Sequence, residues 1–152
     1  MITYLCDTNV WLALTFENHE HARVATRWLN SVQEPGSISF CRTTQRCFLR
    51  LITSAAVAAL YGFPPLTNTQ AWITYDAFIR DNRIVLRADE PADLDRYWRD
   101  CADRPTASPK LWMDAYLAAF ALAAGHQFVT TDRAFRQFRG LDLLVLEETP
   151  SS

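Results

Sequence analysis

Three aspartates occupy positions from which a carboxylate can bind a cation. Asp7 directly follows the apolar stretch 2–6, and Asp132 follows the stretch 128–131; both stretches are typical of buried strands. Ligands of parallel α/β sheets bind beyond the carboxyl ends of the strands, so we expect both carboxylates at one edge of a sheet. Aspartate is also a favoured helix N-cap, and capping alone would explain either residue taken singly.

The third aspartate, Asp114, lies in a segment that is apolar on nearly every side, residues 109–124, which predicts a buried helix. An ionised carboxylate in such a helix is costly unless it is paired or bound to a cation. The alternative is an ion pair with Lys110, four residues earlier, which contributes only about 0.3 kcal/mol on an exposed helix.

A bound cation explains all three acids together. Carboxylates that converge within about 5 Å repel by roughly 3 kcal/mol per pair at an effective dielectric of 20, and a cation removes that cost. Oxygen ligands favour Mg²⁺ or Mn²⁺ over zinc. The histidines, His19, His21 and His126, are not spaced to share a metal and are expected to be structural or surface groups. A metal held by acids above a parallel sheet indicates phosphoryl or phosphodiester chemistry.

Apolar periodicity and turn residues predict strands that alternate with helices along the whole chain. The expected strands are 2–6, 37–40, 84–86, 128–130 and 143–146. The expected helices are a first one through Val10 and Leu14, 22–32, one capped by Thr43 or Thr44 and reaching Ile52, one opening at Asn68 or Thr69, 91–103 capped by Asp89, 109–124 capped by Ser108 and ended by Gly125, and 133–138. This alternation predicts a three-layer α/β/α domain with a central, mostly parallel sheet of four to five strands.

Length and composition fit one domain, residues 1–148, followed by a short C-terminal tail, 149–152. The net charge of -2 argues against a protein that binds nucleic acid by bulk positive charge, although it does not exclude a nucleic-acid enzyme with a local basic patch. Fourteen of the fifteen basic residues are arginine.

The four cysteines form no C-x-x-C pair and are expected to be reduced thiols in a cytoplasmic protein. No apolar run approaches the roughly 18 residues of a membrane span.

Each aspartate lies in a longer motif: Leu-Cys-Asp-Thr-Asn-Val-Trp-Leu-Ala-Leu at 5–14, Leu-Trp-Met-Asp-Ala-Tyr-Leu-Ala-Ala at 111–119, and Phe-Val-Thr-Thr-Asp-Arg-Ala-Phe at 128–135. These three motifs resemble those of PIN-domain nucleases. The size of the chain and the helix at 21–28 are similar to those of VapC-type toxins. The resemblance implies a Mg²⁺-dependent endoribonuclease, with Mn²⁺ as a substitute ion. It also implies a small VapB-type antitoxin as a partner, and a homodimer.

The resemblance implies roles for six residues at the site. The expected metal ligands are Asp7, Asp114 and Asp132, and the expected supporting residues are Thr8, Asn9 and Thr131. Helix capping remains the alternative for the supporting residues, and the two roles are compatible.

One position departs from the family pattern. Many PIN domains carry a glutamate early in the helix after the second strand, where this chain has Arg46. The alternative to an active enzyme is therefore a degenerate PIN module that binds RNA or a protein partner without cleavage. Arg42, Arg46 and Arg50 recur every four residues and predict a basic stripe. We expect Arg46, Arg50 and Arg133 to contact RNA phosphates, with an ordinary solvated face as the alternative.

The alternative enzyme class is a phosphatase on a similar sheet. A haloacid-type phosphatase needs a second aspartate two residues after the first, and Asn9 occupies that position, which argues against this class. The apolar run 54–63 is expected to be core, or else a patch that receives an antitoxin helix or a second subunit.

Overall fold

Five parallel strands form the central sheet of the computed structural model, which describes residues 1–148. The strands are β1 (Tyr4–Cys6), β2 (Ile38–Cys41), β3 (Ile84–Arg87), β4 (Gln127–Thr130) and β5 (Leu143–Val145). Their order across the sheet is β3-β2-β1-β4-β5, and every neighbouring pair is parallel. The predicted tail, 149–152, lies outside the described residues, so the domain bounds stay a prediction.

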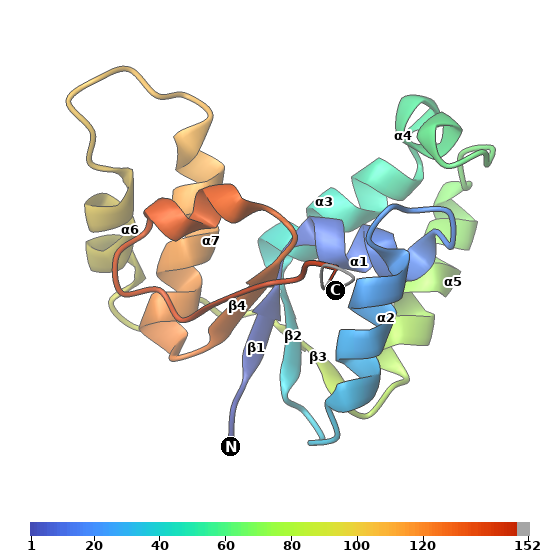
Figure 1. Cartoon of the computed structure of the whole chain (residues 1–152), viewed down its shortest axis with the longest axis horizontal. Coiled ribbons are helices and arrows are strands. Elements are labelled where there is room, and N and C mark those ends of the chain that lie inside the picture. The colour runs from blue at the N-terminus through green and yellow to red at the C-terminus, as the bar shows by residue number, and fades with distance from the viewer. Residues whose placement is uncertain (149–152) are drawn as a thin grey trace.

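Helices cover both faces of this sheet, which confirms the predicted three-layer α/β/α architecture (Figure 1). One side carries α1 (Thr8–Thr15), α2 (Ala22–Ser31), α3 (Arg42–Ile52), α4 (Ala55–Leu60) and α5 (Asn68–Ile79). The other side carries α6 (Leu94–Ala102), α7 (Leu111–Ala124) and the 3₁₀ helix η1 (Arg133–Gln137). Among residues 1–148, no helix is both long and apolar enough to cross a membrane.

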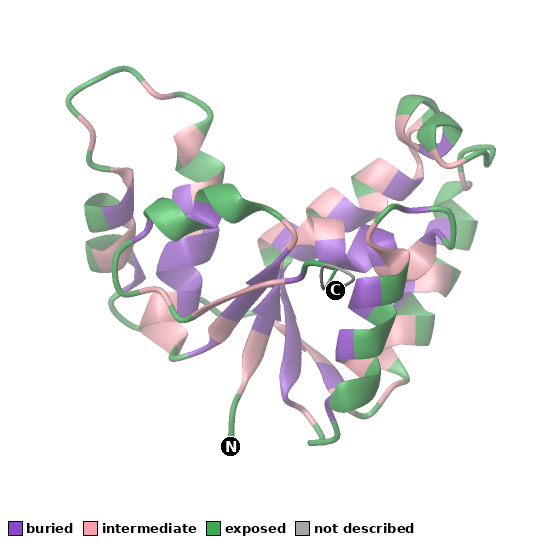
Figure 2. Ribbon diagram, viewed as in Figure 1, coloured by how far each residue is buried: buried purple, intermediate pink, exposed green. Residues whose placement is uncertain are grey.

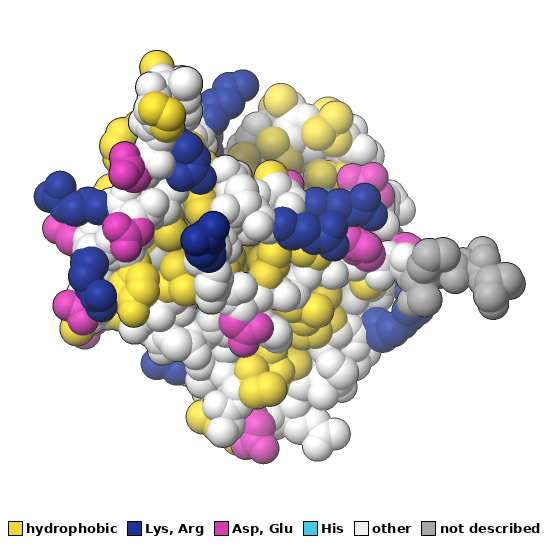
Figure 3. Space-filling model, turned by 60° about the vertical axis from the view of Figure 1, so that its left-hand side comes forward, with side chains coloured by type: hydrophobic (Ala, Val, Ile, Leu, Met, Phe, Trp, Pro, Cys, Tyr) yellow, Lys and Arg dark blue, Asp and Glu magenta, His cyan; other side chains and the backbone are white. Residues whose placement is uncertain are grey.

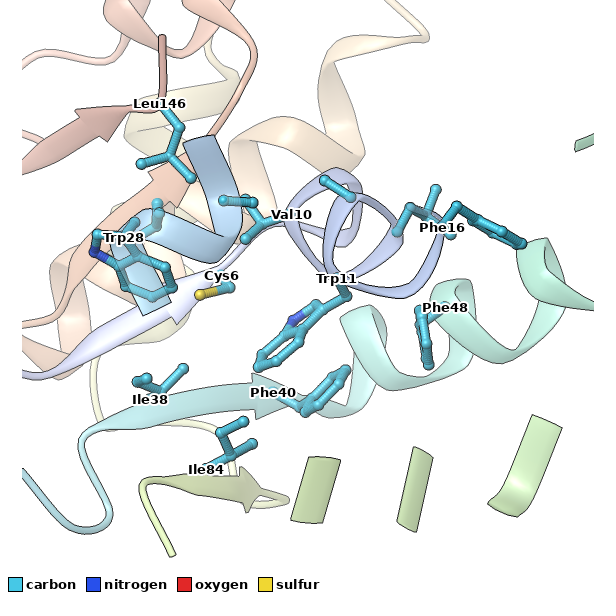
Figure 4. Packing of buried hydrophobic residues seen from close by; sticks show 14 of the residues in the cluster. Cys6, Val10, Trp11, Phe16, Trp28, Ile38, Phe40, Phe48, Ile84 and Leu146 are labelled. Atoms are coloured by element: carbon cyan, nitrogen blue, oxygen red, sulfur yellow. The ribbon is translucent and has the colours of Figure 1, made fainter. Parts of the chain in front are cut away.

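Each face of the sheet has its own hydrophobic core. On the α1 side, the fully buried Trp11 stacks on Phe40 with ring centroids 3.8 Å apart (Figure 4). On the α7 side, the buried residues are mostly small, including Ala115, Ala118 and Ala119. Small side chains let α7 lie close to the sheet. The central strands β2 and β4 and most of β1 are consequently buried, the edge strands β3 and β5 are mostly of intermediate exposure, and the outer surfaces of the helices are exposed (Figure 2).

Helix starts were the least predictable part of the fold. The expected cap Ser108 is wrong because α7 begins at Leu111, after Lys110, which makes no side-chain capping bond. Asp89 does not cap α6 either, because that helix begins at Leu94 after a left-handed Asp93 with φ of 65°. By contrast, Gly125 ends α7 as predicted, in the left-handed conformation (φ 72°) that glycine adopts without strain.

Two other helices differ from expectation. Helix α3 begins at Arg42, directly after β2, and Thr44 closes a capping box from inside the helix because its hydroxyl accepts the backbone N–H of Cys41. The run 54–63 contains α4, which is capped by the Ser54 hydroxyl; because Leu60 is 77% exposed and Phe63 is 39% exposed, the prediction of core is wrong, and the alternative of an exposed apolar patch agrees with the structure. The short length of α4 and the repeated alanines of this run gave no helical periodicity to detect.

Candidate metal centre

The topology brings the three aspartates to the carboxyl edge of the sheet. Asp7 follows β1 and Asp132 follows β4, and these two strands are neighbours. The backbone N–H of Asp7 donates to the carbonyl of Val129 at 2.8 Å, which fixes the two strand ends together. Asp114 lies in the first turn of α7, whose C-terminus leads back to the start of β4. The first turn of α7 therefore lies at the same edge as Asp7 and Asp132.

Hydrogen bonds hold the carboxylate of Asp7 in one orientation. The hydroxyl of Thr130 donates to Oδ2 at 2.7 Å, and the backbone N–H of Thr8 donates to Oδ1 at 2.8 Å. The Thr130 oxygen also accepts the backbone N–H of Asp132 at 3.0 Å. Thr130 is fully buried and links two of the three acids. Sequence reasoning did not single it out, although a hydroxyl at the end of a buried strand needs a partner, which is a usable signal.

The supporting residues expected from the sequence lie around this network. Asn9 contacts the Thr130 hydroxyl through its side-chain amide and accepts the backbone N–H of Thr131 on Oδ1. Asp132 is itself the N-cap of η1, where its Oδ1 accepts the N–H of Ala134 at 2.9 Å. Capping and a place at the candidate site therefore coincide at Asp7 and at Asp132.

The electrostatics of the site favour a cation. The pKa of Asp7 is raised to about 6, mainly by burial; its hydrogen bonds from Thr130 and Thr8 lower the pKa, and the charges of Asp114 and Asp132 raise it. Burial and then the charge of Asp132 raise the pKa of Asp114. The alternative ion pair with Lys110 is not formed among residues 1–148. Among residues 1–148, none of the three carboxylates forms an ion pair with a basic side chain, so no direct ion pair offsets their repulsion.

The donor set consists of carboxylate oxygens, which suit a hard divalent cation. Within the described residues, no three histidine, cysteine, aspartate or glutamate side chains lie close enough to form a closed ligand cage. Mg²⁺ does not need such a cage, because it keeps several water ligands and is usually held by one or two carboxylates. Within the described residues, the three aspartates therefore do not form a complete ligand set by themselves, and an ion bound there would keep water ligands.

The arginines lie beside this edge as an exposed stripe on α3 and a second group after Asp132. Arg42, Arg46 and Arg50 are all exposed, which confirms the predicted stripe. Arg133 donates to Glu147 at 2.9 Å, and Arg136 shares the same carboxylate at 3.3 Å. Helix α3 contains no acidic residue, so it adds no fourth carboxylate to the site.

Comparison with known proteins decides the family. The sequence profile of the PIN domain matches residues 4–141, a range that contains all three aspartates. The chain belongs to the PIN domain family. This PIN domain is 53% identical over 142 residues to Ribonuclease VapC41 of Mycobacterium tuberculosis, a match that covers 93% of this chain and 97% of the relative.

Solved structures with low sequence identity share the fold of this PIN domain. The Mycobacterium tuberculosis toxin VapC20, described as cleaving the sarcin-ricin loop, matches with a TM-score of 0.61 and 16% identity, covering 92% of this chain and 98% of the toxin chain. A toxin-antitoxin complex from Klebsiella pneumoniae matches with a TM-score of 0.56 and 17% identity, covering 97% of this chain and 100% of the matched chain. These likenesses establish the architecture, a parallel sheet between two helical layers.

Proposed function

We propose that this PIN domain is a metal-dependent endoribonuclease of the VapC type. The observation that carries the proposal is the group of three mutually repelling carboxylates at the carboxyl edge of the sheet, with the pKa of Asp7 raised to about 6. A divalent cation relieves that repulsion. The relative with 53% identity, whose name is that of a ribonuclease, supports RNA as the substrate.

In this proposal, Asp7 and Asp114 hold a Mg²⁺ ion, for which Mn²⁺ can substitute, and Asp132 completes the ligand set directly or through water. The bound ion supplies an activated water and neutralises charge that develops on the phosphate. Thr130 and Thr8 keep the Asp7 carboxylate oriented toward the site through the two hydrogen bonds already described. Hydrogen bonds of Asn9 to Thr130 and Thr131 connect the start of α1 to the end of β4 and so help to fix the position of Asp7.

In this proposal the arginine groups contact RNA phosphates. They form local basic surfaces even though the net charge of the whole chain is -2. Arg46 and Arg50 project from α3 as part of the exposed stripe, and Arg133 lies next to Asp132. Arg133 and Arg136 share one glutamate, so that pair keeps a net positive charge beside the candidate metal site. Exposed arginines of this kind bind phosphates without reading sequence.

A VapB-type antitoxin is the proposed protein partner, and the toxin itself is proposed to be a homodimer. The similarity to a chain of a toxin-antitoxin complex supports the antitoxin. A cytoplasmic location is also proposed, and the proposed RNA substrate and the four free cysteines of the described residues support it.

The competing function is a degenerate PIN module, suggested by Arg46 at the position where many relatives have glutamate. The 53% identical relative argues against it, since that protein is named a ribonuclease over nearly the same length. The raised pKa of Asp7 argues in the same direction, because a fold that had lost its cation would gain stability by replacing that acid.

The proposed function predicts metal-dependent cleavage of structured RNA. Purified protein incubated with tRNA and ribosomal RNA fragments in Mg²⁺ is expected to give discrete products, and excess EDTA is expected to abolish them. Gel analysis of end-labelled RNA is the measurement. RNA binding without cleavage in Mg²⁺ or Mn²⁺ would instead establish the degenerate module, and cleavage that persists in EDTA would contradict a metal site.

A further inference from the structure

A cavity of about 580 Å³ includes Met113, the residue before Asp114, and none of the three aspartates of the candidate metal centre lines it. Its walls come from the start of α3, the loop after β3, and helices α6 and α7. Arg42 and Arg46 form one side, and Trp98, Trp112, Met113 and Tyr116 form the other. A volume of this size is typical of pockets that bind small organic groups.

The cavity and the candidate metal centre share helix α7. Asp114 is the residue after Met113, and Tyr116 follows two positions later. On the opposite wall, Arg42 comes directly after Cys41, the last residue of β2, which is the strand beside β1 and Asp7. The cavity therefore lies at the same end of α7 and of β2 as the candidate metal centre.

Exposed aromatic surface is the most unusual feature of this cavity. Trp112 is 59% exposed and Met113 is 52% exposed. The neighbouring Trp98 is held in place: its ring packs edge-on against Tyr116 at 5.2 Å, and its indole N–H donates to the backbone carbonyl of Trp112 at 3.1 Å. An indole that is exposed on such a fixed support presents a flat apolar face for a planar ligand.

The charged side chains of the cavity determine where the anionic part of a ligand can bind. Arg42 and Arg46 attract an anion along one side, whereas the carboxylate of Glu90 lies in the same cavity and accepts the Tyr116 hydroxyl at 2.5 Å. A phosphate is disfavoured beside Glu90 but is favoured along the exposed arginine stripe. On the face of the molecule shown in Figure 3, hydrophobic, basic and acidic side chains are interspersed. Alternating flat apolar and basic groups are the pattern that binds single-stranded nucleic acid.

We propose that this cavity binds one nucleobase of single-stranded RNA, next to the phosphate that is cleaved, by stacking of the base on Trp112. The adjacent backbone phosphates contact Arg42 and Arg46. This inference rests on the proposed ribonuclease function for the identity of the nucleic acid, and it adds a residue that sets substrate preference. A protein segment in the same cavity is the competing occupant, and the experiment separates the two.

Binding of a fluorescein-labelled 2′-O-methyl hexanucleotide, followed by anisotropy in EDTA, tests the proposal without cleavage. The comparison ligand is the same backbone with abasic positions. Wild-type protein is expected to bind the base-bearing oligonucleotide roughly tenfold more tightly, and Trp112→Ala is expected to remove most of that preference. Trp112→Phe should restore it in part. Trp72→Ala is the matched control, because Trp72 is 51% exposed on α5, on the other side of the sheet.

Circular dichroism and thermal melting of each variant check that the fold is intact. Equal binding of the two oligonucleotides by the wild type would overturn the proposal, as would a loss of preference in Trp72→Ala equal to that in Trp112→Ala. Unchanged preference in a folded Trp112→Ala protein would also overturn it and favour a protein occupant. If the wild type cleaves no RNA but keeps the Trp112-dependent preference, the proposed function fails and the base site stands.

Discussion

Asp7→Asn is expected to lower RNA cleavage by about a hundredfold or more, which is a larger effect than the 10- to 100-fold losses typical of residues that only support a metal ligand. Asparagine has the same shape and keeps an oxygen that can accept the Thr8 N–H, so the local fold is preserved. It removes the charge that a cation needs at the end of β1. The rate of cleavage of one labelled RNA under saturating Mg²⁺ is the measurement.

Asp114→Asn should produce a loss of the same order, because its carboxylate is the second proposed ligand. Asp76→Asn is the matched control, since Asp76 is exposed on α5 and the charge of Asp76 is not among the causes that raise the pKa of Asp7. Activity within a few fold of wild type in both Asp7→Asn and Asp114→Asn would show that the cleaving site lies elsewhere on the molecule.

The second large effect concerns the stability of the metal-free protein. The pKa of Asp7 is raised from 3.8 to about 6 by folding, so the native state favours the protonated acid. Because the native state holds a proton that the unfolded chain releases, the free energy of unfolding contributed by Asp7 falls as pH rises from about 4 to 6. A difference of about two pKa units corresponds to about 3 kcal/mol. At pH 8 in EDTA, Asp7→Asn should therefore be more stable than wild type, by about 2 kcal/mol after loss of the Thr130 bond.

Urea unfolding of wild type and Asp7→Asn at pH 4 and pH 8 measures this effect. The difference between the two proteins isolates Asp7 from His126, whose pKa burial lowers to about 4 and whose contribution therefore has the opposite dependence on pH. The stability advantage of the variant should be absent at pH 4. Mg²⁺ at pH 8 should stabilise the wild type and not the variant. A difference that does not change with pH would contradict the raised pKa of Asp7.

The positions of the three aspartates could be predicted because they depend on a general rule of parallel sheets. Asp7 and Asp132 each end a strand that is apolar in sequence, and the polar Asp114 interrupts an otherwise apolar helix. The five-strand order follows less directly, since the neighbours of β1 are β2 and β4 and the second pairing joins segments more than 120 residues apart.

The remaining features depend on packing between distant segments. The link from Thr130 to Asp7 requires β1 and β4 to be neighbours in register, which the residues of either strand alone do not specify. The cavity needs Arg46, Glu90 and Trp112, from three separate segments, to meet. The incorrect caps at Asp89 and Ser108 reflect the opposite situation: both residues have good local capping chemistry, but the helices begin later.

Isothermal titration calorimetry with Mn²⁺ at pH 7.5 tests most directly whether the aspartates form a cation site. Wild type and Asp76→Asn are expected to bind the ion with the same affinity, and Asp7→Asn and Asp114→Asn are each expected to weaken binding by tenfold or more. Wild-type affinity in both Asp7→Asn and Asp114→Asn would contradict a cation site at these aspartates. The ion would then bind elsewhere, and no bound cation would offset the repulsion between the carboxylates.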